Sequence, residues 1–115
     1  MHVVPFEQAP LYEAPGHRDM VMRRLQGREA GPSDTMWMGI SVIRPAAGTA
    51  STASPVEKFY LVLDGELEVR ASSLAGQLTA RLRAHDSCRI APGESRELRN
   101  PGDRPCTVLL VMPHC

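Results

Sequence analysis

The stretch KFYLVLDGELEV, residues 58–69, constrains the fold of this chain more than any other segment. Five consecutive β-forming residues, 59–63, come directly before Asp64 and Gly65. A segment of alternating acidic and apolar residues, 66–69, then leads away. Asp-Gly between two such runs is a strong hairpin signal, because a tight primed turn needs positive φ at both central residues. The stretch therefore predicts two paired antiparallel strands joined by a tight turn.

Short runs of β-forming residues recur along the chain between turn residues, and ten prolines and nine glycines leave few windows long enough for a helix. The loops and turns are expected at residues 27–34, 45–48 and 100–105. The other strands are expected at residues 20–25, 35–43, 77–83, 87–91, 95–99 and 106–112. Short strands at near-regular spacing favour an all-β fold, a sandwich or a barrel.

The first 19 residues contain three prolines and Gly16, so they are expected to form an extended N-terminal arm along the barrel or a partner subunit. At 115 residues the chain is long enough for one domain with a single core. Residues 1–34, the arm and first strand, are therefore predicted to belong to the same domain as a barrel over residues 35–115.

The charge balance excludes some partners. Thirteen basic and thirteen acidic side chains cancel, whereas nucleic-acid binders usually carry a basic excess. A membrane-surface role is disfavoured for the same reason, and no run approaches the roughly 20 apolar residues of a membrane span. The N-terminal residues lack the basic and apolar layout of a secretion signal. We therefore expect no nucleic-acid or membrane partner and a cytoplasmic location.

Three cysteines, Cys88, Cys106 and Cys115, have no metal or redox spacing. An odd number of cysteines in such a chain indicates reduced thiols. Cys88 and Cys106 lie within expected strands, where we expect them to act as small buried apolar residues.

Two segments resemble the motifs of the cupin family, whose first motif is G-x5-H-x-H-x3,4-E-x6-G and whose second is G-x5-P-x-G-x2-H-x3-N. Gly48 and Gly65 frame the first motif, while Pro92, Gly93 and Asn100 match the second. The resemblance covers about residues 35–112. It implies a cupin-type double-stranded β-helix, or jelly-roll, barrel, because the matching residues determine backbone geometry.

The metal-ligand positions of the family do not match. Aligned on the glycines, the first-motif positions fall on Thr52, Ser54 and Lys58, and the histidine position of the second falls on Arg96. Lys and Arg are hydrogen-bond donors only and repel a cation, whereas metals in such sites need imidazole, carboxylate or thiolate ligands. No metal and no other cofactor is therefore expected.

Strand alternation places Lys58 and Tyr60 on one face, which is the inside of the barrel if the ligand positions of the family point inward. Arg96 is expected inside on the same argument. Together with the hydroxyls of Thr52 and Ser54, these side chains would suit a small carboxylate, which Arg can bind through two hydrogen bonds. Lys58, Arg96 and Tyr60 are the predicted catalytic residues, Lys58 as a base or Schiff-base nucleophile.

Trp37 and His17 are further candidate substrate-binding residues, with His17 above the open end of the barrel as an acid or base. Each candidate has a structural alternative. Trp37 and Tyr60 could be core residues, and Thr52 and Ser54 could face solvent. Lys58 could instead pair with Glu57, Glu66 or Glu97 or extend out of the barrel. Arg96 could instead bridge to Glu94 or to a main-chain carbonyl.

Three functions follow from these alternatives. The first is a metal-independent enzyme acting on a small carboxylate, such as an isomerase, lyase or decarboxylase. The second is a binding protein, a sensor or accessory subunit, that uses the same pocket without turnover. The third is a structural protein with a filled barrel. A homodimer is implied by the resemblance, and the need to cover sheet edges favours it independently.

Overall fold

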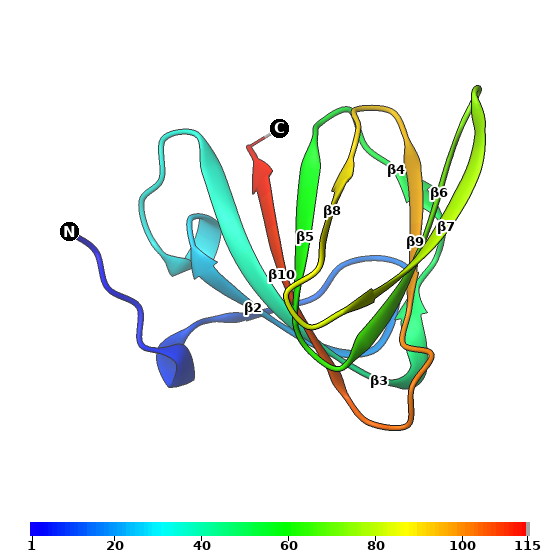
Figure 1. Cartoon of the computed structure of the whole chain (residues 1–115). Helices are drawn as coiled ribbons and strands as arrows, with labels where there is room; N and C mark the ends of the chain where they lie inside the picture. The colour runs from blue at the N-terminus through cyan, green and yellow to red at the C-terminus, as the bar shows by residue number, and fades with distance from the viewer. Residues whose placement is uncertain (115) are drawn as a thin grey trace.

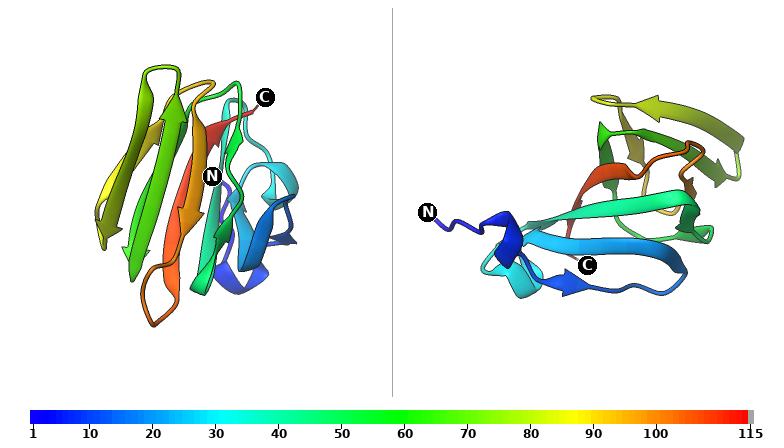
Figure 2. Two further views of the ribbon diagram at one scale, coloured as in Figure 1. Left: turned by 90° about the vertical axis from the view of Figure 1, so that its right-hand side faces the viewer. Right: turned by 90° about the horizontal axis from the view of Figure 1, so that it is seen from below.

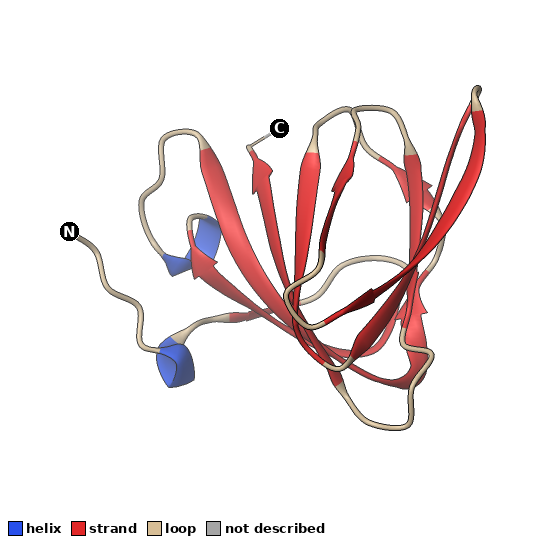
Figure 3. Cartoon of the chain, in the orientation of Figure 1, coloured by secondary structure: helices blue, strands red, loops and turns tan. Residues whose placement is uncertain are grey.

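The computed structural model describes residues 1–114 and is built mainly from β-strands (Figures 1 and 3). Two short 3₁₀ helices, η1 (Phe6–Gln8) and η2 (Arg28–Ala30), lie near the N-terminus. The strands are β1 (Leu11–Tyr12), β2 (His17–Gln26), β3 (Met36–Thr49), β4 (Thr52–Ala53), β5 (Lys58–Asp64), β6 (Glu66–Ser73), β7 (Gly76–Arg83), β8 (Ser87–Ile90), β9 (Ser95–Arg99) and β10 (Cys106–Pro113).

Within the described residues the strands form one ten-stranded sheet in the order β7-β6-β9-β3-β10-β5-β8, with β2 and β1 attached to β3 and β4 attached to β9. Strand β2 pairs with β3 from Met38 to Thr49. The first part of β3 also pairs with β10, whereas Gly48 near its end pairs with Arg99 of β9. The sheet therefore folds over on itself, as Figures 1 and 2 show. The predicted all-β jelly-roll barrel is confirmed.

The predicted hairpin at Asp64-Gly65 is wrong. Strand β5 pairs with β10 and β8, while β6 pairs with β7 and β9, so the two strands lie in different halves of the sheet. Gly65 has a φ of 84°, but Asp64 is not in the left-handed region that a primed turn would require of it. The chain therefore turns a corner at Gly65, and the tight hairpin of this region is β6–β7, where Ser73 pairs with Gly76.

The predicted turn at residues 45–48 is also wrong, because β3 continues through Pro45 to Thr49. A left-handed Ala46, with a φ of 66°, lies where β3 leaves β10 and approaches β9. Proline and a local irregularity are compatible with a strand at such a bend. At Gly48 an added Cβ would lie 1.9 Å from the carbonyl oxygen of Leu98, so the close approach of β3 and β9 requires glycine.

The barrel is filled by apolar side chains from both halves of the sheet. The largest fully buried ones are Ile43, Leu67, Val62, Val108 and Cys106. Cys88 and Cys106 are free thiols, as expected, and Cys106 is fully buried; Cys115 lies outside the described residues. No helix in the described part of the chain is long and apolar enough to cross a membrane.

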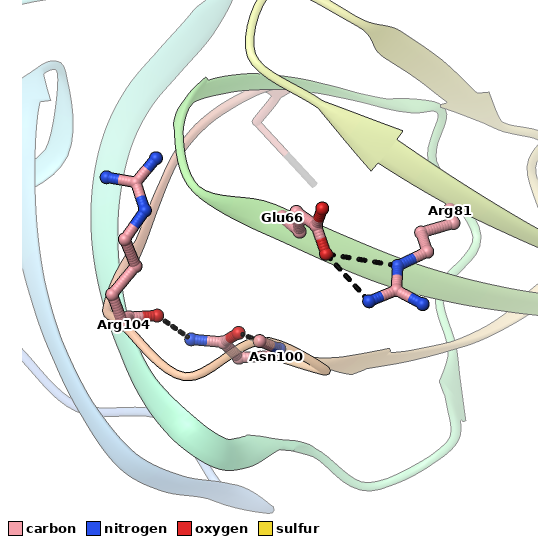
Figure 4. A network of polar contacts seen from close by, with 5 residues as sticks. Glu66, Arg81, Asn100 and Arg104 are labelled. Atoms are coloured by element: carbon pink, nitrogen blue, oxygen red, sulfur yellow. Dashed lines mark hydrogen bonds and ion pairs between the residues drawn. The ribbon is translucent and has the colours of Figure 1, made fainter.

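Asn100, the closing residue of the second motif, is fully buried and ties the β9–β10 turn to β3. Its Nδ2 donates to the carbonyl oxygens of Ile43 at 2.9 Å and Arg104 at 2.8 Å. Its Oδ1 accepts from the Gly102 N–H at 2.9 Å. Figure 4 shows the Asn100–Arg104 contact beside an ion pair of 2.7 Å between Glu66 of β6 and Arg81 of β7.

Candidate functional site

Arg96 is a buried cation in the barrel, with 5% of its surface exposed. It lies on β9, where Arg96 and Leu98 are buried and their neighbours are more exposed, as strand alternation requires. Its Nε donates to the phenol oxygen of Tyr60 at 2.8 Å. Its Nη1 lies within hydrogen-bond distance of Thr49 Oγ1 (3.0 Å), Thr52 Oγ1 (3.0 Å) and the Ala50 carbonyl oxygen (3.3 Å).

Residues from four strands therefore meet in what we call the Arg96 cluster: Arg96, Tyr60, Thr49 and Thr52. The antiparallel register places Thr52 of β4 directly opposite Arg96. Thr49, at the end of β3, is 2% exposed and also accepts a 3.0 Å hydrogen bond from the Leu98 N–H. Thr52 itself is exposed, so it lies at the rim of the cluster.

The Arg96 cluster presents hydrogen-bond donors. Tyr60, Thr49 and Thr52 each accept a bond from the guanidinium through the hydroxyl oxygen, so each hydroxyl hydrogen points elsewhere. Among residues 1–114, Arg96 has no ion-pair partner, and no Asp or Glu is buried. The predicted alternative partner Glu94 instead accepts from the Ala91 N–H at 3.0 Å. The cluster therefore holds a buried positive charge surrounded by neutral groups.

Lys58 and Tyr60 extend this positive region along β5. Both are buried, 7% and 2% exposed, and they lie on the same face about 7 Å apart along the strand. Burial raises the pKa of Tyr60, and the charge of Arg96 and its hydrogen bond act in the opposite direction. The phenol therefore stays protonated and can donate a hydrogen bond at neutral pH.

The N-terminal arm brings two more side chains to this region. His17 pairs with Thr49 in the β2–β3 register, and its Nδ1 lies 2.9 Å from the Pro15 carbonyl oxygen. Burial lowers the pKa of His17, and the charges of Arg96 and Lys58 lower it further. Burial raises the pKa of Tyr12, and Arg96 is among the charges that act on the phenol. The site therefore extends from the barrel to the arm.

Trp37 and Ser54 are not part of the Arg96 cluster. The Trp37 ring packs edge-on against Tyr12, with centroids 6.0 Å apart. The guanidinium carbon of Arg24 lies over both rings, 3.6 Å from the Tyr12 centroid and 4.1 Å from that of Trp37. Among the buried side-chain nitrogen and oxygen atoms of residues 1–114, Trp37 Nε1 is the one that has no hydrogen-bond partner. Ser54 Oγ bonds to the backbone of Val56 in a local turn.

Sequence reasoning missed Thr49 and Tyr12. Thr49 directly follows the turn that was expected at residues 45–48, so it was not assigned to a strand. Had β3 been extended to Thr49, the alternation of side chains along it could have identified Thr49 as a residue that points into the barrel. Tyr12 reaches the site because β1 pairs with β2, opposite Met22, and short strands of two residues carry no recognisable pattern.

The residues at the metal positions of the family do not fit a metal ion. Lys58 and Arg96 occupy two of these positions inside the barrel, and cationic side chains of this kind donate hydrogen bonds and repel a metal ion. Within residues 1–114, no group of three or more His, Cys, Asp or Glu side chains lies close enough together to hold a metal.

Two hollows of the structure lie beside the arm. One of about 530 Å³ is lined by Leu11, Tyr12, Glu13, Met20, Val21 and Met22. Another of about 310 Å³ includes Glu13, His17, Asp19 and Arg44. Inside the barrel, Cys88 of β8 and Leu110 of β10 lie opposite Tyr60 on its two neighbouring strands. Both are partly exposed, so solvent reaches the barrel interior beside Tyr60.

Known proteins with the same fold have several activities. The crystal structure of the polyketide cyclase RemF from Streptomyces resistomycificus matches with a TM-score of 0.82, 19% identity and coverage of 98% of this chain and 79% of that one. A predicted oxalate decarboxylase from Thermotoga maritima matches with a TM-score of 0.80 and 19% identity, over 98% of this chain and 99% of the other. At this identity the likeness shows the fold alone.

A sequence relative covers nearly the whole chain. The Mycobacterium tuberculosis protein named Beta-D-galactosidase Rv1717 is 38% identical over 117 residues, which are 99% of this chain and 95% of that protein. The sequence pattern of the family described as the cupin domain matches residues 39–112. The chain therefore belongs to the cupin family.

Proposed function

We propose that this cupin binds a small organic anion in the barrel through a carboxylate, without a metal. The observation that carries the proposal is the burial of Arg96, which is 5% exposed and is surrounded by hydroxyls and a carbonyl. Among residues 1–114, no acidic side chain forms an ion pair with it. A buried charge is costly unless it is paired. A bound carboxylate would supply the missing negative charge.

The hydrogen-bond donors of the site also support the proposal that it binds an anion. A carboxylate has about four lone-pair positions and no hydrogen to donate, so it matches a site made of Arg, Lys and hydroxyl hydrogens. Lys58 adds a second buried positive charge on β5. The apolar side chains of Leu110, opposite Tyr60, and Ile90, opposite Lys58, would accommodate an apolar or aromatic ligand body.

Two uses of such a site are proposed. With turnover, the bound carboxylate would be the substrate of an isomerase, lyase or decarboxylase, with Lys58, Arg96 and Tyr60 as the catalytic groups. Without turnover, the same contacts would serve a sensor or accessory protein. Mass spectrometry of each bound acid before and after incubation separates the two uses, because only the first changes the acid.

The binding test compares Arg96→Met with Arg99→Met. Arg99 lies on the same strand and is exposed, so it is a matched control for the loss of a charge. A panel of small carboxylates is screened by thermal shift and confirmed by calorimetry. We expect an acid to bind the parent protein and Arg99→Met, and Arg96→Met to lose at least about tenfold in affinity. Equal binding by all three proteins would refute the proposed site.

A second candidate function, hydrolysis of a β-galactoside, is favoured by the 38% identity to the mycobacterial protein named as a galactosidase. Most glycosidases use a pair of carboxyl groups. Glu13 and Asp19 both line the 310 Å³ hollow beside the arm, together with His17. This hollow is therefore where we would place such chemistry.

The galactosidase test uses p-nitrophenyl β-D-galactoside. If the hollow beside the arm is catalytic, Glu13→Gln and Asp19→Asn should lose most of the activity, while Arg99→Met keeps it. Hydrolysis that survives both carboxyl substitutions would exclude this location. Absence of hydrolysis by the parent protein, with a carboxylate bound, would leave anion binding as the function.

We also propose a homodimer. Leu11 and Val21, on β1 and β2, are exposed apolar residues beside the arm. Strand β1 covers β2 only opposite Met22 and Arg23, so part of the β2 edge is uncovered by it. A partner subunit at this edge would cover both features. A monomeric mass in light scattering at micromolar concentration would refute this proposal.

A further inference from the structure

We propose that His17 is the proton-carrying residue of the anion site: neutral while the site is empty, it takes up one proton from solvent when an organic anion binds. This inference rests on the anion-binding function proposed above. It adds a third, conditional positive charge to Arg96 and Lys58, and it makes binding depend on pH.

The backbone places His17 beside the Arg96 cluster. In the antiparallel β2–β3 register His17 lies opposite Thr49, so the two side chains share a face of the sheet. Thr49 Oγ1 in turn accepts a 3.0 Å hydrogen bond from Arg96. The imidazole is therefore separated from the guanidinium by one side chain, at the point where the arm meets the barrel.

The tautomer of His17 follows from its hydrogen bond. Its Nδ1 lies 2.9 Å from the carbonyl oxygen of Pro15, and a carbonyl oxygen only accepts. Nδ1 therefore carries the hydrogen, and Nε2 has the lone pair in the neutral ring. Protonation at Nε2 creates a new N–H donor and a positive charge without breaking the bond to Pro15.

The charges around His17 determine when that proton is bound. Partial burial lowers the pKa of His17 first, and the positive charges of Arg96 on β9 and Lys58 on β5 lower it further. The carbonyl oxygens of Pro15 and Ala14 act in the opposite direction. In the empty site at neutral pH the ring is therefore uncharged.

Two acidic residues line the same hollow as His17, Glu13 from the arm and Asp19 from β2. Asp19 lies 3.5 Å from Arg44 of β3, which offsets its charge. Neither acid is among the groups that shift the pKa of His17 appreciably. Among charged side chains, therefore, Arg96 and Lys58 are the ones that shift the pKa of His17, and a negative charge that offsets them would come with the ligand.

A bound anion reverses the effect of the two cations. Its negative charge offsets theirs and stabilises the imidazolium, so the pKa of His17 rises in the complex. Linkage then requires the reciprocal effect: the anion binds more tightly as pH falls through the interval between the free and bound pKa values. Above and below this interval His17 no longer makes the affinity depend on pH.

The test follows His17 directly by NMR, with benzoate as the probe. The ring signal of His17 is identified by its loss in His17→Gln, and His85→Gln is the control because His85 is exposed in the β7–β8 turn. We expect the His17 titration midpoint to rise in saturating benzoate. Without any ligand, the midpoint should also rise in Arg96→Met, whereas Glu13→Gln should leave it unchanged.

Calorimetry supplies the proton count. Benzoate binding measured near pH 7 in phosphate and in Tris, which differ in ionisation enthalpy, should show proton uptake by the parent protein and His85→Gln and none by His17→Gln. Benzoate binding with an unmoved His17 midpoint would overturn this inference and leave the proposed function intact. An absence of binding by benzoate and the whole carboxylate panel would overturn both. An unchanged midpoint in ligand-free Arg96→Met would overturn the inference alone.

Discussion

The guanidinium Nε of Arg96 donates a 2.8 Å hydrogen bond to the phenol oxygen of Tyr60, joining β9 to β5 across the inside of the barrel. The two residues are 36 positions apart in the chain, and both are buried. This bond holds the buried cation in place while its Nη1 contacts Thr49 and Thr52. It therefore contributes to both the stability of the barrel and the geometry of the candidate site.

The substitution Tyr60→Phe should reduce stability by about 1–3 kcal/mol, because it leaves a buried, charged N–H donor without its acceptor. Urea unfolding of the parent protein and the variant measures the loss. The unfolding slope should stay the same, since the apolar ring is retained. An unchanged midpoint would show that the hydrogen bond contributes nothing to folding.

The substitution Gly48→Ala should destabilise the barrel by about 1–3 kcal/mol or more, because the new methyl group would lie 1.9 Å from the Leu98 carbonyl oxygen. Strands β3 and β9 would have to separate, which would also move Thr49 away from Arg96. The control is Gly102→Ala, where the nearest atom would be 3.4 Å away. Thermal unfolding should show a lower midpoint for Gly48→Ala only; equal midpoints would refute the close approach.

Lys58 is the only lysine of the chain, so amine-directed reagents can modify its Nζ and the N-terminal amine alone. At 7% exposure, Nζ should be acetylated much more slowly in the native protein than in urea. Mass spectrometry with peptide mapping measures both rates, and the N-terminal amine is the internal control. Equal rates for Lys58 in the native and unfolded protein would place its amine outside the barrel.

Burial raises the pKa of Cys106 to about 11, with the charge of Asp64 as a smaller cause. In the unfolded chain the thiol would ionise near its ordinary pKa of 9.0. As pH rises between these values, the unfolded state loses its proton first, so the free energy of unfolding should fall. Urea unfolding at a series of pH values measures this decline, which should be smaller in Cys106→Ala. An identical decline in the variant would contradict the prediction.

Metal addition should leave the protein unchanged. Because a ligand that binds the native state raises stability by mass action, Mn²⁺, Ni²⁺ or Zn²⁺ should not raise the melting temperature of the parent protein. Purified protein should contain far less than one metal per chain. A positive control restores the family's ligand types through four substitutions: Thr52→His, Ser54→His, Lys58→Glu and Arg96→His. Stoichiometric metal in the parent, removed by chelation with loss of function, would refute metal independence.

The fold could be predicted from the sequence because local signals for strands and turns are independent of partners. Strand β9 begins and ends at the predicted residues, and alternation placed Lys58, Tyr60 and Arg96 on buried faces. Local signals could not show that β5 and β6 do not pair with each other. Asp-Gly favours a tight turn, but which strand lies beside β5 depends on β10, more than 40 residues away.

The candidate site was predicted only in part for a related reason. The inward residues of single strands can be identified by alternation, but the Arg96 cluster is assembled from four strands whose relative positions depend on the bend in β3. Thr49 reaches Arg96 because β3 bends toward β9. Tyr12 reaches the site because the two-residue strand β1 pairs with β2. Neither feature has a local sequence signal.

The last strand of the chain lies between β3 and β5, and so closes the barrel. Strands that are distant in the sequence pair with one another, as β3 and β5 do with β10 and β6 does with β9. Folding of such a topology is slow, because distant segments must meet before their contacts add stability. During synthesis, β3 and β5 emerge well before their shared neighbour β10. The barrel can therefore close only after β10 has been synthesised and has paired with both of these strands.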